Sequence, residues 1–158
     1  MILIKIPRRK RHCDICKAVF SYTSPYDTVL IEENEGWNRL DYCSKCWSPH
    51  LKEGAKSHWR ALVPAKNEST APDENSFLNL VDHLRFFLEK GSNPSQAFIL
   101  ALYLLRKKVL QKRQELEHEG MLVTLYEVKN SDEILVVPHV DITNLDAAQL
   151  QNELQALL

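Results

Sequence analysis

The sequence predicts an α+β fold, in which a cysteine-rich N-terminal module precedes a helical pair, a β-hairpin and a final helix. Three observations support this prediction. All four cysteines stand in two Cys-x-x-Cys pairs, Cys13/Cys16 and Cys43/Cys46, with 26 residues between the pairs. Apolar residues recur at helical spacing between positions 77 and 105, and β-branched runs follow position 121.

The two cysteine pairs have the spacing of a tetrahedral metal site. Thiolates two residues apart in a turn can bind one ion from the same side, so two pairs complete a closed Cys₄ site. We therefore predict Cys13, Cys16, Cys43 and Cys46 as ligands of a structural Zn²⁺. Disulfides or a redox-active pair are the alternatives. Disulfides need an oxidising compartment, and the N-terminal residues lack the pattern of a signal peptide.

The segment between the pairs favours strands at Val19–Tyr22, Thr28–Ile31 and Trp37–Tyr42, separated by turn residues. A helix is predicted over residues 44–59, where the second cysteine pair begins it. This helix would make the module a treble clef, whereas a zinc ribbon has a strand at the same place. The apolar residues that recur at helical spacing are Trp47, Leu51, Ala55 and Trp59.

A polar, proline-containing stretch at 65–73 predicts a linker between a zinc-binding module, 1–64, and a second domain, 74–158. The second domain is expected to begin with a helix capped by Asp73 or Asn75 and ended by Gly91. Asn93 and Pro94 then begin a second helix, which is predicted to continue through the basic residues 106–113 toward residue 120.

A β-hairpin is predicted from Met121–Val128 and Glu133–Val137, and Asp146 is the expected N-cap of the last helix. An apolar stripe on that helix is expected to dock on the core or on a second subunit. Self-association or a protein partner bound through this helix is therefore an alternative function. The stripe consists of Leu150, Leu154 and Leu157.

Composition indicates a globular chain with 44% hydrophobic and 26% charged residues. The longest apolar run, Ala97–Leu105, is far shorter than the roughly 20 residues that span a bilayer, so we expect no membrane association and a cytoplasmic location. The net charge of −1 is unevenly distributed: residues 1–66 hold 12 Lys/Arg against 7 Asp/Glu, and residues from 114 onward hold 1 against 9.

Basic residues near the cysteines predict binding to a polyanion, because phosphates neutralise several cations at once. A solvated arm and the solvated end of a helix are the simpler alternatives. We predict a non-enzymatic nucleic-acid-binding protein, with RNA ahead of DNA, since no phosphate-cradling glycine loop or catalytic triad pattern is present. The predicted contacts are Arg8, Arg9, Lys10 and Arg11 in the arm, Lys45, Lys52, Lys56 and Arg60 in the zinc module, and Arg106, Lys107 and Lys108.

The order of these motifs resembles that of a small conserved signature protein shared by planctomycetes, verrucomicrobia and chlamydiae. The resemblance spans nearly the whole chain and is sharpest at the cysteine motifs. It implies a housekeeping nucleic-acid-binding role linked to translation. The motifs that carry it are the basic arm ending in Arg11-His12-Cys13-Asp14-Ile15-Cys16, the segment Asp41–Trp47, the apolar helix running into Leu104–Lys107, and the closing hairpin with its Leu-rich helix.

Overall fold

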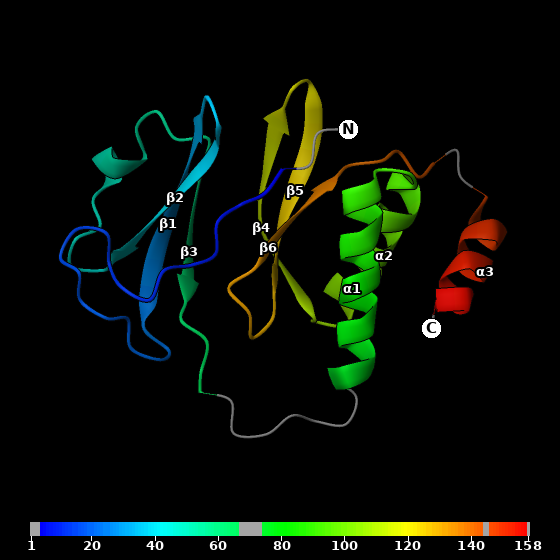
Figure 1. The fold of residues 1–158 in the computed structure, drawn as a ribbon, viewed down its shortest axis with the longest axis horizontal. Coiled ribbons are helices and arrows are strands. Elements are labelled where there is room, and N and C mark those ends of the chain that lie inside the picture. The colour runs from blue at the N-terminus through cyan, green and yellow to red at the C-terminus, as the bar shows by residue number, and fades with distance from the viewer. Residues whose placement is uncertain (1–3, 67–73, 144–145, 158) are drawn as a thin grey trace.

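The protein is described by a computed structural model over residues 4–66, 74–143 and 146–157. These residues form two three-stranded antiparallel sheets and a layer of helices (Figure 1). The α+β class is therefore confirmed. The strands are β1 (Pro25–Glu33), β2 (Gly36–Cys43), β3 (Ser57–Leu62), β4 (Leu110–His118), β5 (Met121–Val128) and β6 (Ile134–Pro138); the helices are α1 (Glu74–Lys90), α2 (Pro94–Arg106), α3 (Ala147–Leu157) and the short 3₁₀ helix η1 (Pro49–Lys52).

The second sheet, in the order β4-β5-β6, lies in the middle of the molecule and is covered on both faces. Alternate side chains of a strand point to opposite faces. Val123 and Leu125 accordingly pack toward the first sheet, whereas Tyr126 and Val128 join the cluster formed with α1 and α2. Burial on both faces explains why β5 and β6 are almost continuously apolar in sequence.

The first sheet has the order β2-β1-β3, and it packs one face against β4, β5 and β6. The shared buried cluster contains Tyr26, Leu30 and Trp59 from the first sheet, and Ile6 from the N-terminal arm. The arm crosses in front of the sheets before it reaches the first cysteines (Figure 1). One cluster therefore draws residues from both predicted domains, while most of the predicted linker falls outside the described residues.

The predicted helix over residues 44–59 is wrong. After a tight turn at Cys43–Trp47 the chain forms only η1, and Gly54 adopts φ 74°, a left-handed conformation that suits glycine. Residues from Ser57 onward then form β3. Trp47 stacks on the outer face of the sheet, against His58, whereas Trp59 is buried on the inner face. The apparent helical stripe thus combines residues from opposite faces, and the strand corresponds to the zinc-ribbon alternative rather than the treble clef.

The predicted extension of the second helix beyond Arg106 is also wrong. Lys108 has φ 60°, and the Val109 N–H donates to the Leu104 carbonyl, so the helix ends there and the chain turns into β4. β4 is an edge strand that carries many charged residues, a composition that also fits a helix. The Val19–Tyr22 segment likewise forms only an isolated bridge, between His12 and Val19.

The remaining predicted helices and strands are confirmed, except for the cap of the first helix: Asn75 lies inside α1, and Asp73 lies outside the described residues. α1 ends at Lys90 just before Gly91, which has φ 61°, and α2 starts at Pro94. The β5–β6 hairpin lies where it was predicted, and the Asp146 carboxylate accepts a hydrogen bond from the Ala148 N–H at 2.9 Å as the N-cap of α3. None of the helices in the described ranges is long and apolar enough to cross a membrane.

Candidate metal centre and its basic surroundings

The four cysteines come together at the edge of the first sheet, as the sequence predicted. Their sulfur atoms all lie within 4.8 Å of one another, and Cys16 and Cys43 are 3.8 Å apart. Sulfur atoms bound to one zinc at about 2.3 Å in a tetrahedron stand roughly 3.8 Å apart. All four thiols are free, so no disulfide joins them. The donor set and its spacing therefore fit one tetrahedral metal ion.

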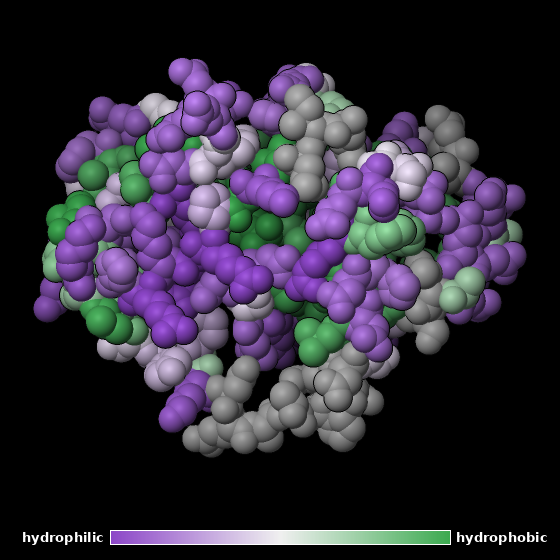
Figure 2. All heavy atoms as spheres, viewed as in Figure 1, coloured by the Kyte–Doolittle hydropathy of each residue, from purple (hydrophilic) through white to green (hydrophobic). Residues whose placement is uncertain are grey.

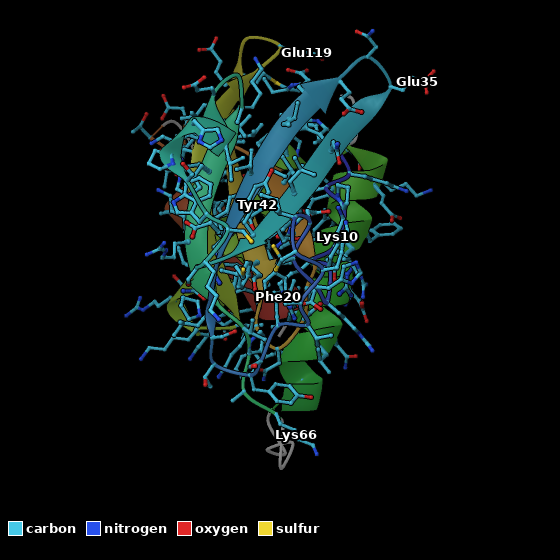
Figure 3. All side chains as sticks on the ribbon, turned by 90° about the vertical axis from the view of Figure 1, so that its left-hand side faces the viewer. Lys10, Phe20, Glu35, Tyr42, Lys66 and Glu119 are labelled. Atoms are coloured by element: carbon cyan, nitrogen blue, oxygen red, sulfur yellow. The ribbon has the colours of Figure 1, made fainter. Side chains whose placement is uncertain are left out.

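Two similar turns place the sulfurs. In the first, the Lys17 N–H donates to the Cys13 carbonyl at 3.0 Å; in the second, the Trp47 N–H donates to the Cys43 carbonyl at 2.9 Å. Lys17 takes up φ 61°, which closes the first turn. Because β1 and β2 are paired along their whole length, Cys43 at the end of β2 is held in register opposite Tyr26. Figure 3 shows the yellow sulfur atoms gathered near Tyr42 and Lys10.

Cys13 is the most enclosed ligand, and its sulfur accepts backbone N–H groups from Ile15 and Cys43, each at 3.4 Å. Burial opposes ionisation of this thiol, but the N–H groups of Cys43, Cys16 and Ile15 outweigh it and lower the pKa of Cys13 to about 6. Cys46 behaves in the opposite way, because hydrogen bonds with the sulfurs of Cys16 and Cys43 raise its pKa to about 12. Four thiolates this close together repel one another, so all four can be ionised only when a bound cation offsets their charge.

These pKa shifts predict how zinc affinity depends on pH. Above about pH 6 Cys13 is already a thiolate, so zinc does not displace its proton, whereas Cys46 must always lose one. Below pH 6 the Cys13 proton also competes. In a chelator competition from pH 5 to pH 8, the slope of log affinity against pH should therefore steepen by one below about pH 6. A constant slope from pH 5 to pH 8 would contradict the lowered pKa of Cys13.

A buried ionic network behind the site attaches the first cysteine turn to the sheet. Arg39 and Asp41 are both fully buried, with Arg39 Nε 3.0 Å from Asp41 Oδ1, and Thr28 Oγ1 donates to the same oxygen at 2.6 Å. The second Asp41 oxygen accepts the Lys10 N–H at 3.1 Å, and the Asp41 N–H donates to Asp14 Oδ2 at 2.7 Å. Since Asp14 lies between Cys13 and Cys16, the network positions both the arm and the ligand turn.

A second buried carboxylate, Asp27, organises the outer face of the first sheet. It accepts two hydrogen bonds from Arg60, through Nε and Nη2, and lies 2.9 Å from His58 Nε2. The His58 ring stacks on Trp47 with the ring centroids 4.4 Å apart and the planes 7° apart. Trp47 directly follows Cys46, so this stack fixes the second cysteine turn against β3.

The predicted nucleic-acid contacts divide into two groups in the structure. Several are taken up by carboxylates of the chain: Arg9 pairs with Asp132, Lys10 with Asp14, Lys56 with Glu32, and Arg60 with Asp27. Others are exposed and form no ion pair within the described ranges. This second group consists of Arg8, Arg11, Lys45 and Lys52, together with Lys17, which sequence reasoning missed.

Arg106, Lys107 and Lys108 are exposed at the end of α2, and Lys107 lies over the Tyr103 ring. The second sheet separates this end of α2 from the cysteine turns along the long axis of the molecule (Figure 1). The three residues therefore do not join the basic residues of the cysteine turns, Lys17 and Lys45, in one surface.

The surface around the cysteine turns is not purely basic. Figure 2 shows hydrophobic groups among hydrophilic ones at its left edge, over the cysteine-bearing loops. Ile15 is 52% exposed, Val19 77% and Tyr22 62%, all in or just after the first turn. Such side chains offer contacts for a ring or an apolar group of a partner.

Fold and cysteine cluster together define an α+β protein with a candidate Cys₄ metal site. Comparisons of the chain with protein-family models, curated proteins and solved structures found no match. The function is accordingly inferred from the site itself.

Three features of the site were not anticipated from the sequence. They are the Arg39–Asp41 pair, the role of Asp14, and the Asp27–His58–Trp47 group. Arg39 and Asp41 are two apart on a predicted strand, and so on one face, which was a usable signal. No comparable signal in the sequence connects Asp27 to His58.

Proposed function

We propose that the protein is a non-enzymatic, zinc-stabilised nucleic-acid-binding protein that takes single-stranded RNA in preference to DNA. The observation that carries the proposal is the group of exposed cations on and beside the cysteine turns, Arg11, Lys17 and Lys45, which form no ion pairs with described carboxylates. Phosphates are the partner that such a group favours.

Zinc serves this function as a structural ion. Four thiolates fill a tetrahedral site, so no position remains for water or substrate, and the metal fixes two turns whose exposed side chains contact the ligand. The site residues would hold the ion, and the basic residues would hold the nucleic acid.

A single strand is the favoured form of the ligand for two reasons. Tyr22 is 62% exposed close to the first turn, and aromatic rings stack on unpaired bases. In addition, the described residues around the cysteine turns form no α-helix that could enter the major groove of duplex DNA. A role linked to translation rests on the family resemblance alone.

The proposal is tested by titrating a fluorescent single-stranded RNA at several salt concentrations. Binding should weaken steeply with salt, and Arg11→Gln and Lys45→Gln should each lower the slope of log affinity against log salt by about one. Lys108→Gln, which removes an exposed cation at the far end of α2, is the matched control and should change little. Absence of binding at low salt, or affinity independent of salt, would remove the proposal.

The second candidate is a protein-interaction adaptor, which the exposure of Ile15 and Val19 favours. Within the chain, Leu154 of α3 packs against the cluster around α1 and α2, and Gln96 of α2 donates to Glu153 at 3.0 Å. Leu154 is thus engaged with the core, which was one of the two predicted outcomes. The side chain of Leu157 lies outside the described part, and self-association through α3 stays a prediction. The RNA titration separates the two candidate functions, because a protein that acts only as an adaptor should not bind RNA even at low salt.

A further inference from the structure

A groove of about 340 Å³ opens between β3 of the first sheet and β4 of the second. β3 and β4 lie side by side in Figure 1, and the Gln114 side chain bridges them by donating to the His58 carbonyl at 3.4 Å. The groove is lined by Pro25, Arg60, Ala61, Leu62, Gln111 and Arg113.

Arg113 enters this groove because of a β-bulge. Lys112 pairs with Tyr126 and Gln114 with Leu125, so Arg113 is the extra residue without a partner on β5. A bulge of this kind redirects a side chain that would otherwise follow the pleat of the strand. Only 10% of the Arg113 side chain is exposed, yet its one hydrogen bond in the described structure runs from Nε to Glu127 Oε2 at 2.8 Å. Its terminal N–H groups therefore have no acceptor among the described residues.

Arg60 faces the same groove and is held in a similar way. Its Nε and Nη2 donate to Asp27, which is buried, while Nη1 has no acceptor in the described part of the chain. Each guanidinium is thus oriented from behind by a buried carboxylate, and its remaining donors are available on the groove side. Because the carboxylates offset the positive charge, such a site depends on directed hydrogen bonds as well as on charge.

From this geometry we infer that the β3–β4 groove is a phosphate subsite, bound by Arg60 and Arg113 with Gln111 as a further donor. Pro25 and the exposed Leu62 form an apolar wall on which the sugar or base of the same nucleotide rests. Ser44, in the second cysteine turn, donates to the Pro25 carbonyl at 3.4 Å. The groove therefore adjoins this turn, which also carries the exposed Lys45. The assignment of this phosphate to RNA rests on the proposed function, and the subsite would then be one of the places where the RNA backbone binds.

Two matched variants test the subsite. The double variant Arg60→Gln/Asp27→Asn removes one guanidinium, and the double variant Arg113→Gln/Glu127→Gln removes the other, so that neither variant leaves a buried carboxylate unpaired. Each should weaken single-stranded RNA binding by roughly tenfold and lower the salt slope by about one, at an unchanged unfolding temperature. Lys90→Gln, at the end of α1, is the control and should leave binding unchanged.

The second readout does not depend on RNA. In the wild-type, zinc-loaded protein, titration with uridine monophosphate or inorganic phosphate should shift the NMR signals of the Arg60 and Arg113 Nε–H groups. Stronger shifts with the nucleotide would assign the apolar wall to the sugar or base, and equal shifts would mean that the subsite recognises the phosphate group alone.

The outcomes separate the two proposals. RNA binding that is unchanged by both groove variants, with unshifted arginine signals, would overturn the subsite and leave the proposed function standing. Shifted arginine signals in a protein that binds no RNA would overturn the proposed function and support a site for free phosphate. Unshifted signals together with no RNA binding would overturn both.

Discussion

Replacing Cys13 by Ser is expected to abolish metal binding and to unfold the first sheet. Structural zinc contributes about 10–16 kcal/mol in zinc-finger peptides, which is comparable with the whole stability of a domain, about 5–15 kcal/mol. Cys13 is buried and also accepts two backbone N–H groups, so its loss removes a ligand and two hydrogen bonds of the turn. The metal content should fall from one ion per chain to nearly none.

Tryptophan fluorescence reports this change selectively, because the three tryptophans are Trp37, Trp47 and Trp59. All three should become exposed in Cys13→Ser and shift their emission to the red. The cluster formed by α1, α2 and the second sheet contains no residue before position 77, so most of the helical circular dichroism should persist. Ser44→Ala, in the second cysteine turn, is the control and should keep metal and fluorescence. A Cys13→Ser protein with one bound zinc and unshifted emission would show that Cys13 is not a ligand on which the first sheet depends.

Replacing Arg39 by Met should destabilise the protein by about 3–5 kcal/mol, because the Asp41 carboxylate would stay buried without its counter-charge. The loss should also reach the metal site, since Asp41 connects through its N–H to Asp14 in the first cysteine turn. Urea unfolding of the zinc-loaded protein measures the change. Arg106→Met, at an exposed position, is the comparison and should alter the free energy of unfolding by less than about 0.5 kcal/mol.

The double variant Arg39→Met/Asp41→Leu distinguishes a buried unpaired charge from simple loss of packing. Removing both charges should cost less than the sum of the two single changes, by about 0.5–3 kcal/mol. Some loss should remain, because Thr28 and the Lys10 N–H would lose their acceptor. Strictly additive effects, or an Arg39→Met protein as stable as the wild type, would show that the pair contributes little.

The metal ligands could be predicted from sequence because they depend only on local spacing. Two Cys-x-x-Cys turns determine where four sulfurs can meet, and the structure brings them within 4.8 Å. The helices α1 and α2 and the β5–β6 hairpin could also be predicted from sequence, since their apolar periodicity and their proline and glycine boundaries are local signals.

The predictions for β3 and β4 were wrong for the same reason. Their local sequence pattern fits a helix, whereas tertiary contacts make them strands. Trp59 and Ala61 alternate with exposed residues because β3 buries one face against the second sheet, a fact absent from the spacing of Trp47 and Trp59. β4 is rich in Gln, Lys and Glu, which favour helices, and it becomes a strand by pairing with β5.

The basic residues illustrate a further limit, since the sequence shows charge but not pairing. Arg9 and Lys56 stand among the predicted nucleic-acid contacts, yet their partners are Asp132 and Glu32, which are distant in the chain. Conversely, Arg113 stands out only because a bulge in β4 turns it into the groove. The position of a bulge depends on the register between two strands, which single-sequence patterns do not specify.

X-ray absorption at the zinc edge, on untagged wild-type protein with its metal content measured in parallel, shows directly whether the four cysteines hold a closed zinc site. We expect one zinc per chain surrounded by four sulfur atoms at about 2.3 Å, with no nitrogen or oxygen ligand. Protein without stoichiometric metal, or an ion with fewer than four sulfur ligands and a bound water, would contradict the closed structural site.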